Sequence, residues 1–129
     1  MTAGVDEVGR GCLAGPVVSA SVILADTIDL SLLCDSKELT YLKREKIANH
    51  IIQNSIAIGI GLCTNIEIDQ INIHEATLLS MSRSLTSLSI TPDKALIDGL
   101  YTPDHSINCE PVIKADKSIS VVSAASILA

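Results

Sequence analysis

Four acidic residues directly follow short apolar segments of the sequence. Asp6 and Glu7 are adjacent, Asp98 lies in L-I-D-G, and Asp116 lies in V-I-K-A-D. Carboxylates that converge repel one another unless protons or cations lie between them. Oxygen ligands of this kind suit Mg²⁺ or Mn²⁺, and two such ions can activate a water and stabilise the leaving oxygen of a phosphodiester. We therefore predict metal-assisted phosphodiester hydrolysis, a prediction that depends on all four acids because any one of them could instead cap a helix or start a turn.

The segments that precede these acids are predicted strands. Thr2–Val8 and Val17–Leu24 are apolar, and the glycine-rich connection between them cannot form a helix, so we expect a hairpin. Ser55–Cys63 alternates bulky and small residues, which predicts a strand with another element packed closely on its small face. Ala95–Ile97 and Pro111–Ile113 are predicted to be short buried strands, each leading to an aspartate. Neighbouring strand ends converge on one crevice in an α/β sheet, so we expect the acids to meet there.

Three further segments have helical spacing. Thr40 is a candidate N-cap, and Asn72 with Glu75 resembles a capping box. Pro92 is expected to end the helix that begins after Asn72. The third helix, Val121–Ala129, is apolar on nearly every side, so we expect it to be surrounded by protein. The apolar stripes of the first two helices are Ile47, Ala48, Ile51 and Ile52, and Leu78, Met81, Leu85 and Leu88.

Composition is typical of a globular chain. The 129 residues are 47% hydrophobic, which excludes a disordered protein, and residues 1–129 are expected to form a single domain. The net charge of −6 disfavours a protein that binds nucleic acid through bulk positive charge alone, although bound divalent cations would change that balance. We find no signal peptide, no apolar run that could span a bilayer, and no cysteine spacing of a zinc site. We therefore expect a cytoplasmic protein with reduced thiols.

The order of motifs along the chain resembles bacterial ribonuclease HII, the type 2 ribonuclease H family. The resemblance covers essentially the whole sequence, which makes it more specific than any one motif. The motifs are G-V-D-E-V-G-R-G at Gly4–Gly11, L-A-G-P-V-V at Leu13–Val18, D-S-K at Asp35–Lys37, E-I-D-x-x-N-I at Glu67–Ile73, A-T at Ala76–Thr77, L-I-D-G at Leu96–Gly99, K-x-D at Lys114–Asp116 and S-A-A-S-I-L-A at Ser123–Ala129.

The resemblance implies a ribonuclease H-like α/β fold, in which a five-stranded mixed sheet, with its first three strands antiparallel, is flanked by helices. It implies an endonuclease that cleaves the RNA strand of RNA–DNA hybrids, including single ribonucleotides in duplex DNA. The residues at the positions of the family's catalytic, metal-binding acids are Asp6, Glu7, Asp98 and Asp116. We expect Mg²⁺ or Mn²⁺ as the cofactor, two ions during catalysis, a nucleic-acid partner, no membrane, and a monomer.

Other matched positions are expected to bind the substrate. Glycines let backbone groups approach a ribose closely, and the 2′-hydroxyl is what distinguishes RNA from DNA. The resemblance implies that the G-R-G loop recognises this hydroxyl and that D-S-K contacts the nucleic-acid backbone. The expected substrate-binding residues are Gly9, Arg10, Gly11, Ser36, Lys37 and Lys114, of which Lys114 could instead offset the charge of Asp116. Leu100 departs from the family, which has asparagine after L-I-D-G, but this removes no metal ligand.

Alternative functions follow from the end of the sequence and from the order of its elements. Family members continue beyond S-I-L-A, so the resemblance implies that a C-terminal helical segment is missing and that the domain is incomplete. The alternative to an enzyme is therefore an inactive truncated remnant that keeps the acids but only binds nucleic acid or folds poorly. A signalling receiver domain is rejected, because it needs a helix in place of the glycine-rich connection and an acid after the third strand. His74 and His105 have no partner at metal-ligand spacing, and we expect neither to act.

Overall fold

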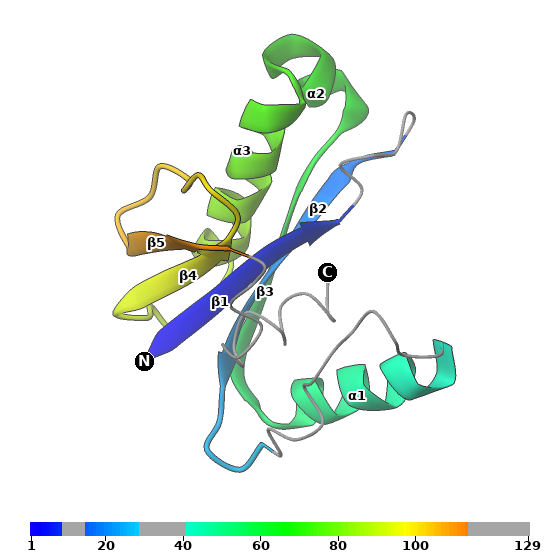
Figure 1. Ribbon diagram of the computed structural model, residues 1–129, viewed down its shortest axis with the longest axis vertical. Helices are drawn as coiled ribbons and strands as arrows, with labels where there is room; N and C mark the ends of the chain where they lie inside the picture. Colours follow the sequence, from blue (N-terminus) through cyan, green and yellow to red (C-terminus); the bar gives the residue numbers. More distant parts are fainter. Residues whose placement is uncertain (9–14, 29–40, 114–129) are drawn as a thin grey trace.

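Five strands form one mixed sheet with helices around it (Figure 1). The computed structural model describes residues 1–8, 15–28 and 41–113. The strand order in the sheet is β3-β2-β1-β4-β5. The strands are β1 (Thr2–Val8), β2 (Val17–Leu24), β3 (Ser55–Cys63), β4 (Lys94–Asp98) and β5 (Asn108–Val112), and the helices are α1 (Tyr41–Gln53), α2 (Asn65–Ile71) and α3 (Ile73–Thr86).

The strand pairing confirms the predicted hairpin and the mixed sheet. β1 pairs antiparallel with β2, and β2 pairs antiparallel with β3. β4 runs parallel to β1, and β5 runs parallel to β4. The last strand was expected at Pro111–Ile113, but β5 begins at Asn108 and ends at Val112. β5 lies at the sheet edge, where a proline is tolerated and where the polar, exposed residues Asn108 and Glu110 hide the strand pattern.

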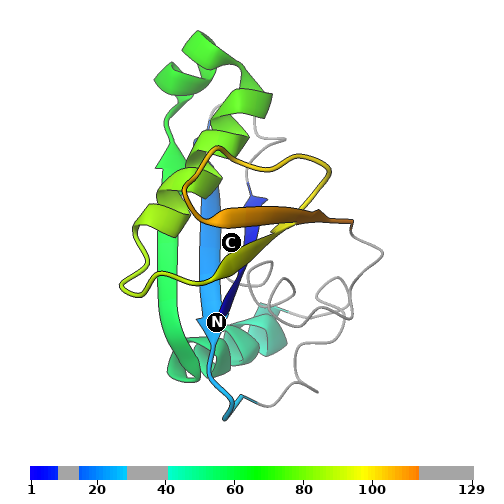
Figure 2. The same cartoon turned by 90° about the vertical axis from the view of Figure 1, so that its left-hand side faces the viewer.

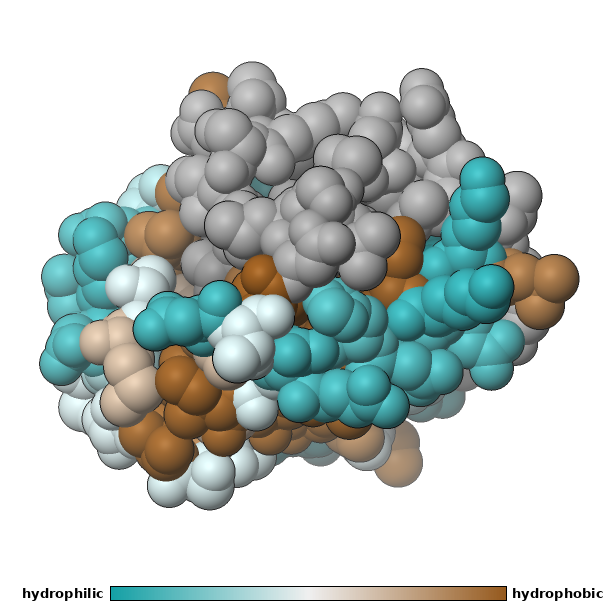
Figure 3. Space-filling model, turned by 90° about the horizontal axis from the view of Figure 1, so that it is seen from below, coloured by the Kyte–Doolittle hydropathy of each residue, from teal (hydrophilic) through white to brown (hydrophobic). Residues whose placement is uncertain are grey.

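The helices cover opposite faces of the sheet (Figure 2). The larger core lies between α3 and the sheet, and its members include Val5, Ile23, Met81, Leu85 and Ile97. The smaller core lies under α1 and consists of Val22, Ile28, Ile47 and Ile51. Seen from the α1 end, the surface mixes hydrophilic and apolar side chains (Figure 3), and Ile52, which was expected in the buried stripe of α1, is exposed. No helix in residues 1–8, 15–28 and 41–113 is both long and apolar enough to cross a membrane.

α3 packs directly on the small face of β3, as the sequence predicts. A Cβ added to Gly59 would overlap the backbone carbonyl oxygen of Ser84, and a Cβ on Gly61 would overlap that of Ser80. Two buried hydroxyl pairs beside these glycines join α3 to β2, namely Ser19 with Ser80 at 2.6 Å and Ser21 with Ser84. Small residues therefore set the distance between α3 and the sheet.

The two helices after β3 each begin at a hydrogen-bonded cap. Thr64 and Glu67 form a capping box at the start of α2, a helix that the sequence analysis missed. At the start of α3, the Asn72 Oδ1 accepts a hydrogen bond from the Glu75 N–H at 3.0 Å. The predicted capping box is only half formed there, because the Asn72 N–H is bonded to the carbonyl oxygen of Ile68. α3 then ends at Thr86, well before the proline that was expected to stop it.

Replacing Arg83 with alanine is expected to raise the pKa of Glu67 toward its ordinary value. Hydrogen bonds from the Arg83 guanidinium, at 2.9 and 2.6 Å, hold the pKa of the Glu67 carboxyl at about 2, with a further contribution from the Thr64 N–H. Because the folded-state pKa is lowered, the pair stabilises the fold above the ordinary glutamate pKa and stops doing so as the pH falls toward 2. An NMR titration of the Glu67 carboxyl carbon measures the change. Ile66→Ala on the same helix is the control, and a pKa that stays near 2 without Arg83 would contradict this assignment.

Candidate active site at the strand ends

Two of the predicted acids lie beside each other at the ends of β1 and β4. These strands are parallel neighbours, and Val5 pairs with Ile97. The next residue on each strand is an aspartate, so Asp6 and Asp98 lie on backbones roughly 4.8 Å apart. Val5 and Ile97 face α3. Because side chains alternate along a strand, both aspartates point to the opposite face, the one that carries α1.

The two aspartates share an unfavourable electrostatic environment. Asp6 is only 7% exposed, and this burial raises its pKa to about 8. The negative charge of Asp98 adds to the rise, whereas a hydrogen bond of 2.8 Å from the Glu7 N–H to the Asp6 Oδ1 opposes it. The Asp98 Oδ1 is buried and has no hydrogen-bond partner among the described residues. Within those residues neither aspartate forms an ion pair with a basic side chain, so the pair is chemically suited to take up a cation or a proton.

Glu7 lies at the same strand end but on the other side of the sheet. It pairs with Ser19 of β2, and Ser19 in turn pairs with Gly61 of β3, so this row faces α3. Among the described residues, no three acidic, histidine or cysteine side chains form a group that could hold a metal ion. Of the predicted acids, the structure brings Asp6 and Asp98 together on one face of the sheet, and Glu7, the neighbour of Asp6 in the sequence, lies on the other face.

The other predicted site residues lie outside the described residues, and their roles stay predictions. These residues are Gly9, Arg10, Gly11, Ser36, Lys37, Lys114 and Asp116.

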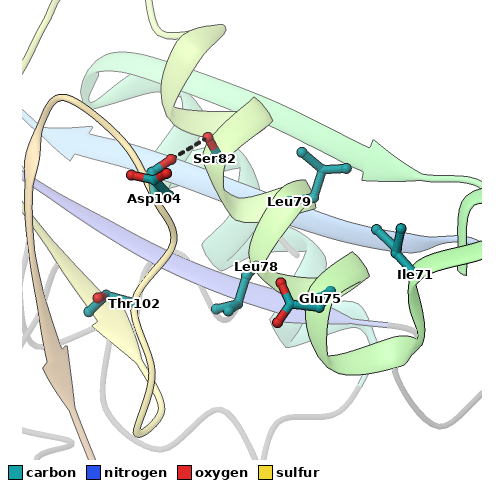
Figure 4. Close-up of a pocket in the computed structure, with 7 residues that line it drawn as sticks. All are labelled: Ile71, Glu75, Leu78, Leu79, Ser82, Thr102 and Asp104. Atoms are coloured by element: carbon teal, nitrogen blue, oxygen red, sulfur yellow. Dashed lines mark hydrogen bonds between the residues drawn. The ribbon is translucent and has the colours of Figure 1, made fainter.

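The loop between β4 and β5 lies along α3, an arrangement that the sequence analysis missed (Figure 4). His74, Leu78, Ser82 and Thr86 are spaced by four residues and so form one stripe on the helix. Three contacts join the loop to this stripe: the His74 ring is edge-on to Tyr101 with centroids 4.7 Å apart, the Ser82 hydroxyl donates to the Asp104 carbonyl oxygen at 3.2 Å, and the Thr86 Oγ1 lies 3.0 Å from the His105 Nε2. His74 and His105, which were expected to have no role, therefore both contribute contacts that hold this loop against α3. The four-residue spacing was the available signal, but polar residues at three of its positions obscured it.

Comparison with known proteins identifies similar chains. The sequence profile of the ribonuclease HII family matches residues 3–129. A ribonuclease HII of Coxiella burnetii is 48% identical over 129 residues, which is all of this chain and 64% of that protein. The crystal structure of a ribonuclease H2 from Pyrococcus horikoshii has a TM-score of 0.82 and 31% identity, and the match covers 98% of this chain and 69% of that one. A ribonuclease HII from Archaeoglobus fulgidus, solved in complex with PCNA, has a TM-score of 0.71 and 26% identity over 99% of this chain and 70% of that one.

These comparisons confirm the ribonuclease H-like fold expected from the sequence. The chain is shorter than the relatives that it matches, and it spans 64% of the length of the Coxiella burnetii ribonuclease HII.

Proposed function

Because the chain belongs to the ribonuclease HII family, we propose that it is a metal-dependent endonuclease that cleaves the RNA strand of RNA–DNA hybrids, including single ribonucleotides in duplex DNA. The observation that carries the proposal is the pair of carboxylates at the strand ends. Asp6 and Asp98 are neighbours on parallel strands, and the described residues supply no cation to them. These are two of the acids that the sequence motifs mark as catalytic.

The chemistry of these residues fits a divalent cation. The Asp98 Oδ1 is buried without a hydrogen-bond partner among the described residues, and the pKa of Asp6 is raised to about 8 by burial and by Asp98. A hard cation bound by oxygen ligands would relieve both penalties. We propose that the acids hold Mg²⁺ or Mn²⁺, and the residues concerned are Asp6, Glu7, Asp98 and Asp116. When bound, such ions supply positive charge to the developing transition state and lower the pKa of water.

The chain's own residues would bind the substrate and hold the phosphodiester in one orientation at the acids. Acids fixed on a sheet hold their ligands in one arrangement, which removes part of the entropic barrier to the reaction. We propose that the G-R-G loop contacts the ribose 2′-hydroxyl, that Ser36 and Lys37 contact the nucleic-acid backbone, and that Lys114 adds a further contact. Cleavage is proposed on the 5′ side of a ribonucleotide, leaving 5′-phosphate and 3′-hydroxyl ends.

One observation favours a second candidate function. Because the chain spans only 64% of the Coxiella burnetii relative, residues 1–129 by themselves could form a remnant that binds nucleic acid without cleaving it. We propose that activity requires the remaining third of the family's length, and that the whole acts as a monomeric enzyme of the cytoplasm.

Cleavage of a labelled RNA–DNA hybrid tests both candidates. The assay compares the 129-residue chain with a longer form, to which the part of the Coxiella burnetii relative that has no counterpart here is joined. We expect the longer form to cleave the hybrid in Mg²⁺ or Mn²⁺, but not in EDTA, and to leave 5′-phosphate ends. The 129-residue chain is expected to cleave weakly or not at all.

Two matched substrates control for other nuclease activities. An all-DNA duplex of the same sequence should remain intact, and a duplex with one ribonucleotide should be cut on its 5′ side. If a longer form that unfolds cooperatively in urea leaves every ribonucleotide-containing substrate intact, the proposed function is wrong. Robust turnover by the 129-residue chain would instead reject the requirement for the additional segment.

A further inference from the structure

We propose that Tyr101 is a nucleic-acid contact that holds the duplex over the acids at the strand ends, and that His74 is the positioning residue that orients its ring; the inference rests on the proposed function. Tyr101 follows Asp98 by three residues, directly after β4 ends. Three residues of chain span at most ~11 Å, or about three base-pair steps along a duplex. The Asp6 and Asp98 side chains face α1, whereas Tyr101 contacts α3. Because both lie at the ends of the strands, a duplex that crosses this edge of the sheet with a phosphate at the acids would have its flanking nucleotides within reach of Tyr101.

The Tyr101 ring is exposed yet held in place. Its side chain is exposed to 61%, although the chain has only two tyrosines and neither phenylalanine nor tryptophan. The His74 ring packs against it edge-on, at an interplanar angle of 84°. The rest of the loop is fixed to α3 through the Asp104 carbonyl, which accepts a hydrogen bond from Ser82 (Figure 4), and through the His105 ring. An exposed aromatic ring whose position is already fixed loses little conformational entropy when it binds a ligand.

His74 and Tyr101 lie at the same end of the sheet as the acids. β1, β3 and β4 all run in one direction, so their carboxyl ends meet there (Figure 1). α2 and the start of α3 follow the end of β3, which brings His74 to this end. Asn72, at the junction of the two helices, has φ 75° and ψ 166°, a conformation that residues other than glycine rarely adopt. Strained backbone of this kind clusters at functional sites, which agrees with a binding role for the junction of α2 and α3.

The charge around Tyr101 favours one direction of approach. A groove of about 500 Å³ beside the loop is lined by Ile71, Leu78 and Leu79, with the carboxylates of Glu75 and Asp104 at its sides (Figure 4). Neither carboxylate forms an ion pair among the described residues, so the groove repels phosphate. A duplex would therefore contact the open side of the Tyr101 ring, where the ring can pack on a sugar or base and the phenol hydroxyl can donate to a phosphate oxygen.

Steady-state kinetics of the longer form on the RNA–DNA hybrid test the inference. Tyr101→Ala is expected to raise KM at least about fivefold, the lower end for loss of one aromatic stacking partner, with kcat within about twofold of wild type. Tyr101→Phe should keep most of the affinity. His74→Ala should raise KM less than Tyr101→Ala does, and His74→Phe, which restores an edge-on ring, should recover it. Ile66→Ala, which removes another exposed apolar side chain at 71% exposure, is the matched control and should change neither constant.

Hybrid binding measured by fluorescence anisotropy in Ca²⁺, which limits cleavage, gives a second readout, and circular dichroism confirms that each variant is folded. If wild type cleaves the hybrid and Tyr101→Ala has an unchanged KM and Kd, the inference is wrong while the proposed function survives. A fall in kcat with an unchanged KM also overturns it. If wild type itself fails to cleave but binds the hybrid, and Tyr101→Ala weakens that binding about fivefold, the contact survives and the proposed function fails.

Discussion

Replacing Asp98 with asparagine should lower hybrid cleavage by a factor on the order of a thousand or more, because the loss of one carboxylate ligand removes several kcal/mol of transition-state stabilisation. The asparagine side chain keeps the shape of Asp98 but carries no negative charge beside Asp6. The measurement is single-turnover cleavage of the hybrid by the longer form in Mg²⁺. Activity within about tenfold of wild type would remove Asp98 from the catalytic acids and, with it, the main support for the proposed function.

The same substitution is expected to stabilise the metal-free fold at high pH. The pKa of Asp6 is raised to about 8, first by burial and then by Asp98, so the folded state keeps a proton that the unfolded state loses near the ordinary aspartate pKa. The stabilisation from this group is complete below about pH 4, declines as the pH rises, and is lost above about pH 8. Asp98→Asn removes the charge repulsion, so the free energy of unfolding should fall by about 1–2 kcal/mol less than in wild type between pH 4 and pH 9. Asp6→Asn should abolish the fall that Asp6 causes.

Urea unfolding in EDTA at pH 5, 7 and 9 measures these differences, and added Mg²⁺ provides the link to function. A ligand at a hundred times its Kd stabilises the folded state by about 2.7 kcal/mol, so Mg²⁺ should stabilise wild type and neither variant. Asp69→Asn, an exposed acid on α2, is the matched control and should behave like wild type. If Asp98→Asn destabilises the metal-free protein at pH 9, the charge repulsion assigned to Asp6 and Asp98 is absent.

The sequence was sufficient to predict the sheet that places these acids. Thr2–Val8, Val17–Leu24 and Ser55–Cys63 were predicted with the bounds that the structure has, since the first two are largely apolar and the third alternates bulky and small residues. β5 was misplaced because an edge strand is partly solvated, and its polar residues break the pattern on which the prediction depends. α2 was missed because it has only seven residues, none of them buried, which is too short for a clear helical period.

The candidate site was predictable only in part for a similar reason. Acids at strand ends can be read from apolar runs, and the parallel register of β1 and β4 then brings Asp6 and Asp98 together. The loop that carries Tyr101 was not predicted, because the α3 residues that hold it, His74, Ser82 and Thr86, are polar and do not stand out as an apolar stripe.

Gly61→Val is expected to destabilise the fold by more than about 3 kcal/mol, a large part of the stability of a typical domain. The small face of β3 is in direct contact with α3, and a Cβ at Gly61 would overlap the backbone of Ser80, Arg83 and Ser84. Valine favours strands, so intrinsic propensity alone would predict a gain in stability. A loss of stability would show that the contact with α3 outweighs the strand propensity of valine, and a gain would show the reverse. Urea unfolding followed by far-UV circular dichroism measures the difference.

The atoms that a Gly61 Cβ would meet are backbone atoms, so trimming side chains on α3 cannot relieve the overlap. Ser80→Gly and Ser84→Gly should accordingly fail to rescue Gly61→Val, because the helix itself must move away from the sheet. Moving α3 would also break the buried pairs Ser19–Ser80 and Ser21–Ser84 and displace the loop that follows Asp98. Ile60→Val, one residue earlier on the open face at 50% exposure, is the control and should cost less than about 0.5 kcal/mol. If either serine substitution restores wild-type stability, side chains rather than the α3 backbone set the spacing of this layer.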